Sequence, residues 1–163
     1  LQIARYTGMR LSEVYGLTWN DIDLENHQIH VNKQLSYIKG VITFEKTKTA
    51  NSVRILPIPP ILEKILIEYQ THELEFEYDL VLNPYKKNGV KCQINTYLKQ
   101  FGDNLSAHNL RHTYATKLLA NGLDVKTVSS LLGDTPQMVM KTYVHYNDEM
   151  KAAASNAVAN IFK

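Results

Sequence analysis

The hydrophobic pattern of this chain changes its period at Pro57 and Pro59, and this change limits the possible folds more than any other feature. Before the prolines, residues 27–58 are rich in β-branched side chains and are divided by turn signals at residues 39–40 and 50–51. We expect three strands there, paired as an antiparallel meander: residues 27–37, 41–46 and 53–58. After the prolines, apolar residues recur at helical spacing. The pattern predicts an α+β domain, mostly helical, with a small three-stranded antiparallel sheet near its N-terminal side.

Capping residues set the boundaries of the expected helices. Gly8 ends a helix over residues 1–7, and Ser12 caps a short second helix. An apolar face over residues 61–69 marks a third, and a linker leads to another through Leu98. The remaining helices are expected from Ser106 to Gly122, from Asp124 to Gly133, from Pro136 to about Tyr146, and after a cap at Asp148.

Length and composition exclude several classes of protein. The 163 residues suit one domain, and no apolar run approaches the roughly 20 residues of a membrane helix. The single Cys92 excludes an internal disulfide and a multi-cysteine zinc site, and it favours a reducing compartment. Because the chain opens with Leu1 instead of Met, we expect it to be an N-terminally truncated fragment.

Charge is unevenly distributed although the net charge is only +2. Residues 27–58 carry five basic side chains against one acidic, and residues 84–122 carry six against one. Between them, residues 59–83 carry six acidic side chains against one basic. Two interpretations stay open: a polarised surface that faces phosphates, or an alternation of solvated faces.

Four local clusters carry the residues suited to chemistry. They are Thr-Gly-Met-Arg-Leu-Ser-Glu over residues 7–13, Lys-Thr-Lys-Thr over 46–49, His-Asn-Leu-Arg-His over 108–112, and Leu-Leu-Gly-Asp over 131–134 followed by Thr-Tyr-Val-His over 142–145. Taken singly, each also has a structural interpretation. Arg10 suits a surface position, the basic hairpin tip suits solvent, and Tyr143 suits core packing.

The histidine cluster favours an anion over a metal. His108, Arg111 and His112 share one face of a capped helix. Two histidines at this spacing suggest zinc, but the glutamate of a metalloprotease helix is missing and Arg111 would repel a dication. Helix N-termini and arginine forks both bind phosphate.

Together and in this order, the clusters resemble the tyrosine recombinases, the phage-integrase family. The resemblance spans residues 7–146 and includes Tyr143 ten residues after Gly133. It implies that residues 1–163 are a helical catalytic domain of the tyrosine-recombinase type, with a DNA-binding domain upstream. For a C-terminal helix over residues 148–163, two interpretations stay open: its apolar stripe packs on its own domain, or, as the resemblance implies, it docks on a neighbouring subunit.

The resemblance implies a role for each matched residue. Tyr143 would attack a DNA phosphodiester, and Tyr146 is its rival three residues on. Arg10 and Arg111 would clamp the non-bridging oxygens, with His108 beside them as hydrogen-bond donor or proton acceptor. Lys48 would protonate the departing 5′ oxygen, and Glu13 would orient the basic cluster.

One position departs from the family pattern: Asp134 stands where a histidine usually follows Leu-Gly. An ionised carboxylate accepts hydrogen bonds only and cannot replace a donor. We expect Asp134 to cap the next helix instead, with Gln137 completing a capping box.

The function expected from these residues is site-specific DNA recombination of the integrase or excision type, without metal, ATP or other cofactor. The expected partners are double-stranded DNA, other subunits in a synaptic tetramer and accessory DNA-bending proteins, in the cytoplasm of a bacterial cell or phage-infected host. Two alternatives stay open: a DNA-binding module that has lost cleavage, and a relaxing topoisomerase of related chemistry.

Overall fold

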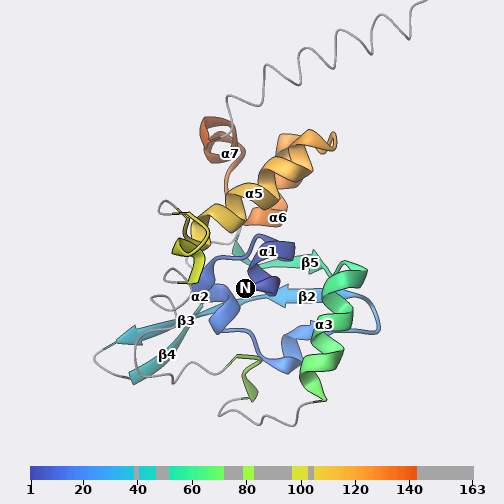
Figure 1. Cartoon of the computed structure of the whole chain (residues 1–163), viewed down its shortest axis with the longest axis vertical. Helices are drawn as coiled ribbons and strands as arrows, with labels where there is room; N and C mark the ends of the chain where they lie inside the picture. The colour runs from blue at the N-terminus through green and yellow to red at the C-terminus, as the bar shows by residue number, and fades with distance from the viewer. Residues whose placement is uncertain (39–40, 47–51, 72–78, 83–96, 103–104, 143–163) are drawn as a thin grey trace, which may run out of the picture.

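Two groups of elements pack side by side in this protein, as Figure 1 shows. The computed structural model describes residues 1–38, 41–46, 52–71, 79–82, 97–102 and 105–142. The first group contains the sheets with helices α1 (Gln2–Thr7), α2 (Leu11–Tyr15) and α3 (Pro60–Gln70). The second contains α5 (Ala107–Ala120), α6 (Val125–Leu132) and α7 (Pro136–Thr142). The expected mostly helical α+β fold is confirmed.

The strands form two antiparallel sheets instead of the expected meander. One sheet has the order β1-β2-β5, from Ile22–Asp23, Gln28–Val31 and Arg54–Pro57. The other is the hairpin of β3 (Lys33–Ile38) and β4 (Val41–Lys46), which projects from the body of the molecule in Figure 1. A three-stranded sheet is therefore present. The expected pairing of the first predicted strand with residues 41–46 is confirmed by the hairpin, but the expected pairing of residues 41–46 with 53–58 was wrong, because β5 pairs with β2.

The reason for the difference lies at Asn32 and at the core. The strand expected over residues 27–37 breaks at Asn32, whose amide donates to Asp21 Oδ1 at 3.0 Å, and Lys33 pairs with the same carboxylate. β5 then pairs with β2, with Leu56 opposite Ile29. Both side chains are fully buried, so this distant pairing removes their apolar surface from water.

Most of the expected helix boundaries are confirmed. Gly8 ends α1 in the left-handed conformation, and Asp124 Oδ1 accepts from the backbone of Lys126 and Thr127 at the start of α6. Ser106 is the N-cap of α5, where its backbone N–H donates to Asn109 Oδ1 at 2.8 Å. Ser12 is a correction, because it lies inside α2 and Arg10 is the N-cap. The helix expected through Leu98 is described in part, over residues 97–99, which are helical; the helix expected after Asp148 falls outside the described residues.

Each group of elements has its own apolar core. The first core gathers side chains of α1, α2, α3, β2 and β5, among them Ile3, Val14, Ile29, Leu56 and Leu62. The second gathers side chains of α5, α6 and α7: Ala115, Leu119, Val128, Leu132 and Val139. The groups meet where α1 packs on α5 and β5 packs on α6. Within the described ranges, every helix falls short of the length and apolarity that a membrane span requires.

Candidate active site

The C-terminal end of α6 collects three arginines from three other elements. The last carbonyl groups of a helix have no partner within it, and they carry the negative end of the helix dipole. Here Leu131 O accepts from Arg54 Nε at 2.7 Å, Leu132 O from Arg111 Nη2 at 2.8 Å, and Gly133 O from Arg10 Nη2 at 3.4 Å. Three successive carbonyls thus hold three cations at the junction of the two groups of elements.

Gly133 makes this helix end possible. Its φ of 68° lies in the left-handed region that favours glycine. The backbone N–H groups of Gly133 and Asp134 then fold back to Ser130 O and Ser129 O, at 3.1 and 3.0 Å. This Schellman motif ends the helix sharply and points the next residue, Asp134, at the arginines.

Arg10 and Glu13 enter the site together from the start of α2. Glu13 Oε2 accepts from the Arg10 backbone N–H at 2.8 Å, and Glu13 Oε1 accepts from Arg10 Nη1 at 3.1 Å. The Glu13 side chain is buried, whereas the Arg10 side chain is 38% exposed. Glu13 therefore holds Arg10 from behind, which agrees with the orienting role expected for it.

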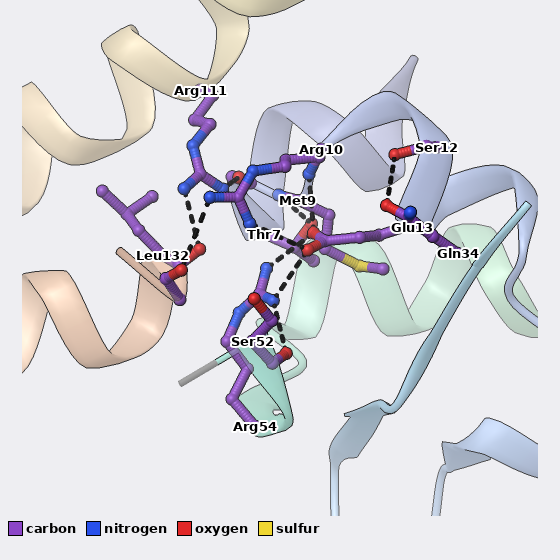
Figure 2. Close-up of polar contacts among 12 residues, drawn as sticks. Thr7, Met9, Arg10, Ser12, Glu13, Gln34, Ser52, Arg54, Arg111 and Leu132 are labelled. Atoms are coloured by element: carbon purple, nitrogen blue, oxygen red, sulfur yellow. Dashed lines mark hydrogen bonds and ion pairs between the residues drawn. The ribbon is translucent and has the colours of Figure 1, made fainter. Parts of the chain in front are cut away.

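Arg54 is a residue of this site that the sequence motifs did not reveal. It lies on β5 with its side chain buried, and its Nη1 and Nη2 donate to the two oxygens of Glu13 at 3.0 and 2.8 Å. Figure 2 shows Glu13 between Arg54 and Arg10. The sequence did contain a signal. Arg54 is two residues before Leu56, so the two side chains lie on the same buried face of the strand, and a charged residue on that face needs a charged partner.

Burial and its arginine partners act in opposite directions on Glu13. Burial raises the pKa of the Glu13 carboxyl, but the hydrogen bonds and charges of Arg54 and Arg10 outweigh it and leave the pKa below its usual value. Glu13 is therefore an anion in the folded protein at neutral pH.

Arg111 reaches the same place from α5. Its Nη1 donates to Gly8 O at 2.8 Å, and its Nη2 donates to Leu132 O and to Asp134 Oδ2, the latter at 2.7 Å. The side chain is only 5% exposed, and this burial lowers the pKa of the guanidinium while Asp134 opposes the shift. Figure 2 shows Arg111 and Arg10 converging above Leu132.

Asp134 is a correction to the sequence analysis. Its carboxylate does not cap α7, because one oxygen accepts from Arg10 Nη2 and the other from Arg111 Nη2. The hydroxyl of Thr135 takes the capping position instead and accepts from the Met138 backbone N–H at 3.3 Å. The two arginines are stronger partners for a carboxylate than a helix N-terminus, because each guanidinium carries a full positive charge and a helix N-terminus the equivalent of only about half a charge.

Of the three remaining residues that were expected in the site, the structure describes only His108. His108 lies exposed in the first turn of α5, with its ring edge-to-face against His112 at 4.4 Å between ring centroids. Burial, with the charges of His108 and Arg111, lowers the pKa of His112. Lys48 and Tyr143 fall outside the described residues; β4 ends at Lys46, and α7 ends at Thr142.

The charges that meet at the end of α6 leave a positive excess. Three arginines face two carboxylates, those of Glu13 and Asp134. This positive excess favours an anion, such as the phosphodiester of a nucleic acid. Arginine forks also match the geometry of phosphate oxygens.

Comparison with known proteins agrees with this arrangement. Residues 1–150 match the model of the phage integrase family. The chain belongs to the phage integrase family. The motif resemblance stated from the sequence is thereby confirmed.

Relatives of this phage-integrase chain include recombinases and a transposase. It is 31% identical to a tyrosine recombinase XerC-like protein of Caldanaerobacter subterraneus, over 96% of the chain and 47% of the relative. It is 30% identical to transposase A of transposon Tn554 from Staphylococcus aureus, over 87% of the chain and 41% of the relative. The chain thus spans about half the length of these relatives.

Solved structures share the fold. The integrase of transposon Tn1549, in complex with transposon right end DNA, superposes with a TM-score of 0.72 at 25% identity. That match covers 94% of this chain and 57% of the integrase. The XerA recombinase, at 22% identity and a TM-score of 0.66, supports the fold alone.

Proposed function

We propose that this chain is the catalytic part of a tyrosine recombinase, which cuts and rejoins double-stranded DNA through a 3′-phosphotyrosyl intermediate. One observation carries the proposal: a single carboxylate, that of Asp134, spans Arg10 and Arg111. Two guanidiniums from distant parts of the chain therefore lie within reach of one anion. A phosphodiester offers two non-bridging oxygens to such a pair.

The residues divide the reaction among them. The Tyr143 hydroxyl gives its proton to His108 as its oxygen attacks phosphorus and forms the phosphotyrosine bond, while the bond to the 5′ oxygen breaks and that oxygen takes a proton from Lys48. Arg10 and Arg111 stabilise the charge that builds on the non-bridging oxygens, with His108 as a further hydrogen-bonding group. The loss of one such donor typically costs about 3 kcal/mol in the barrier. The phosphotyrosine keeps the energy of the broken bond, so rejoining needs no ATP.

The relatives support the substrate class and the setting. Two are described as a tyrosine recombinase and a transposase, and a related integrase was solved with DNA. For the whole protein we accordingly propose a DNA-binding domain upstream of this catalytic domain. We also propose a synaptic tetramer on double-stranded DNA, accessory DNA-bending proteins, and action in the cytoplasm of a bacterial cell or phage-infected host.

A nicked suicide substrate carrying the recombination site tests the proposal directly. The wild-type chain is expected to form a covalent protein–DNA adduct in excess chelator and without ATP, since arginine and lysine cations supply the charge. Tyr143→Phe is expected to abolish the adduct and to leave folding and DNA binding nearly intact, because only the phenol oxygen is lost. Denaturing gels measure the adduct, and circular dichroism measures the fold.

Tyr146→Phe is the matched control, since it removes the same atom three residues on. It is expected to retain the adduct, and mass spectrometry of the trapped peptide is expected to find the phosphate on Tyr143. A phosphopeptide modified at Tyr146 would contradict the assignment. Binding without any adduct would favour the DNA-binding module, and relaxation of supercoils without sequence preference would favour a topoisomerase.

A further inference from the structure

The backbone at the end of α6 brings Asp134 to the two arginines. It is the first residue after the left-handed Gly133, and its N–H is tied to Ser129 O at 3.0 Å. From there, Oδ2 accepts from Arg111 Nη2 at 2.7 Å and Oδ1 accepts from Arg10 Nη2. Each carboxylate oxygen thus serves one guanidinium, as the two non-bridging oxygens of a phosphodiester would.

The donors of Arg111 leave little room for a second anion. Both hydrogens of its Nη2 are used, one by Leu132 O and one by Asp134, and its Nη1 donates to Gly8 O. The Arg111 side chain is 5% exposed, whereas that of Asp134 is 26% exposed. On its open side, therefore, Arg111 is covered by Asp134, and an anion that arrives from solvent meets Arg10 and Asp134 first.

A phosphate and the Asp134 carboxylate cannot both occupy this place. Both are anions that only accept hydrogen bonds, and like charges a few ångströms apart repel strongly where water is scarce. The phosphate can take over both donors, and the partly exposed carboxylate can turn to solvent without leaving a buried charge behind. Arg111 then keeps an anionic partner throughout.

We propose that Asp134 holds the place of the DNA phosphate: in the DNA-free protein its carboxylate keeps Arg10 and Arg111 paired, and a bound phosphate displaces it. This proposal rests on the proposed function, because the displacing group is the phosphate to be cleaved. Asp134 is thus a positioning residue that keeps the two arginines at the spacing of one anion. Phosphate binds only those molecules in which the carboxylate has turned away. The apparent affinity for phosphate is therefore reduced in proportion to that fraction of molecules.

Titration with inorganic phosphate, read by thermal unfolding, tests the displacement without DNA. The 163-residue chain is compared with Asp134→Asn, which removes the charge and nearly preserves the shape. Asp134→Asn is expected to unfold at a lower temperature without phosphate, because buried Arg111 loses its anionic partner. It is expected to bind phosphate about tenfold more tightly than the wild-type chain, because the internal competitor is gone.

Asp124→Asn is the matched control at the other end of α6. Its carboxylate is exposed and caps the helix, so the same change of charge occurs away from the three arginines. Its phosphate affinity is expected to equal that of the wild-type chain. Equal or weaker phosphate binding by Asp134→Asn would overturn the proposal, since it would mean that the carboxylate stays in place or assists the anion.

Two further measurements keep the result decisive. If Asp134→Asn is unfolded without phosphate, recovery of its helical dichroism on adding phosphate supports the displacement, and failure to recover overturns it. The suicide-substrate assay stands apart from the titration. A wild-type chain that forms no adduct, together with tighter phosphate binding by Asp134→Asn, would reject the proposed function and retain the anion exchange at Asp134.

Discussion

At the scale of single residues, Glu13 decides how the arginines are held. It is a buried carboxylate that accepts from Arg54 through both oxygens and from Arg10 through its backbone and side chain. A buried ion pair is costly to form, but breaking it by removing one partner costs about 3–5 kcal/mol, because the other charge remains buried. Glu13, fixed by Arg54, therefore holds Arg10 from behind while its side chain stays partly exposed to solvent.

Glu13→Gln is expected to lower the free energy of unfolding by about 3–5 kcal/mol at neutral pH, because it leaves Arg54 without its anion. The folded-state pKa of Glu13 lies below its usual value of 4.5, so this stabilisation is present above pH 4.5 and is lost as pH falls through the folded pKa. The difference between wild type and variant is accordingly expected to shrink in acid. Urea unfolding at a series of pH values measures both effects.

Glu68→Gln is the control for that series, because Glu68 is exposed on α3. It is expected to change the free energy of unfolding by less than about 0.5 kcal/mol. A Glu13→Gln variant that keeps full stability at neutral pH would contradict the buried ion pair.

At the scale of elements, the end of α6 is the part on which the site is built. Its three carbonyls and Asp134 orient Arg54, Arg111 and Arg10, and the left-handed Gly133 ends the helix so that Asp134 follows it directly. A cation at a helix C-terminus is also favoured by the dipole, typically by 0.3–1 kcal/mol. The helix therefore acts as the support of the site as well as a member of the second core.

Gly133→Ala is expected to cost about 1–2 kcal/mol of stability, since a side chain at φ 68° is strained. It is also expected to slow formation of the covalent adduct, because the carbonyls that hold the arginines shift. Thermal melts and the suicide-substrate rate measure the two effects separately.

Gly122→Ala separates strain from function. Gly122 has a φ of 87° and open space where a Cβ would lie, so it carries the strain without contact to the site. A comparable loss of stability with an unchanged cleavage rate is expected. If both variants slow cleavage equally, the special role of the α6 end is wrong.

At the scale of the whole molecule, the site lies at the junction of two cores. Arg10 and Arg54 belong to the first group of elements and Arg111 to the second. Gly8 allows the close approach of α1 and α5, because a Cβ there would lie 2.4 Å from Tyr114 Cδ1. Both hydrogen bonds and apolar contacts between the two groups of elements thus bring Arg10 and Arg111 together.

Deletion of residues 149–163 tests the proposed docking of residues 148–163 on a neighbouring subunit. The two described cores draw on residues up to Val139, so the shortened chain is expected to keep the wild-type melting temperature within a few degrees. Adduct formation and synapsis are expected to fall, because the docking segment closely follows Tyr143. Circular dichroism measures the stability, and the suicide-substrate assay measures adduct formation. Unfolding of the shortened chain would mean that the segment packs on its own domain.

The sequence by itself determined the family and most ends of the described helices, and it identified Arg10, Glu13 and Arg111, which the structure brings together. Gly8, Ser106, Asp124 and Gly133 act on their own backbone neighbours, so local chemistry was enough to place the helix ends. Only the tertiary structure decided the pairing of β5 with β2, the burial of Arg54 against Glu13, and the bridge that Asp134 makes. These depend on groups far apart in the chain, whose approach is set by the burial of two cores and not by any local pattern.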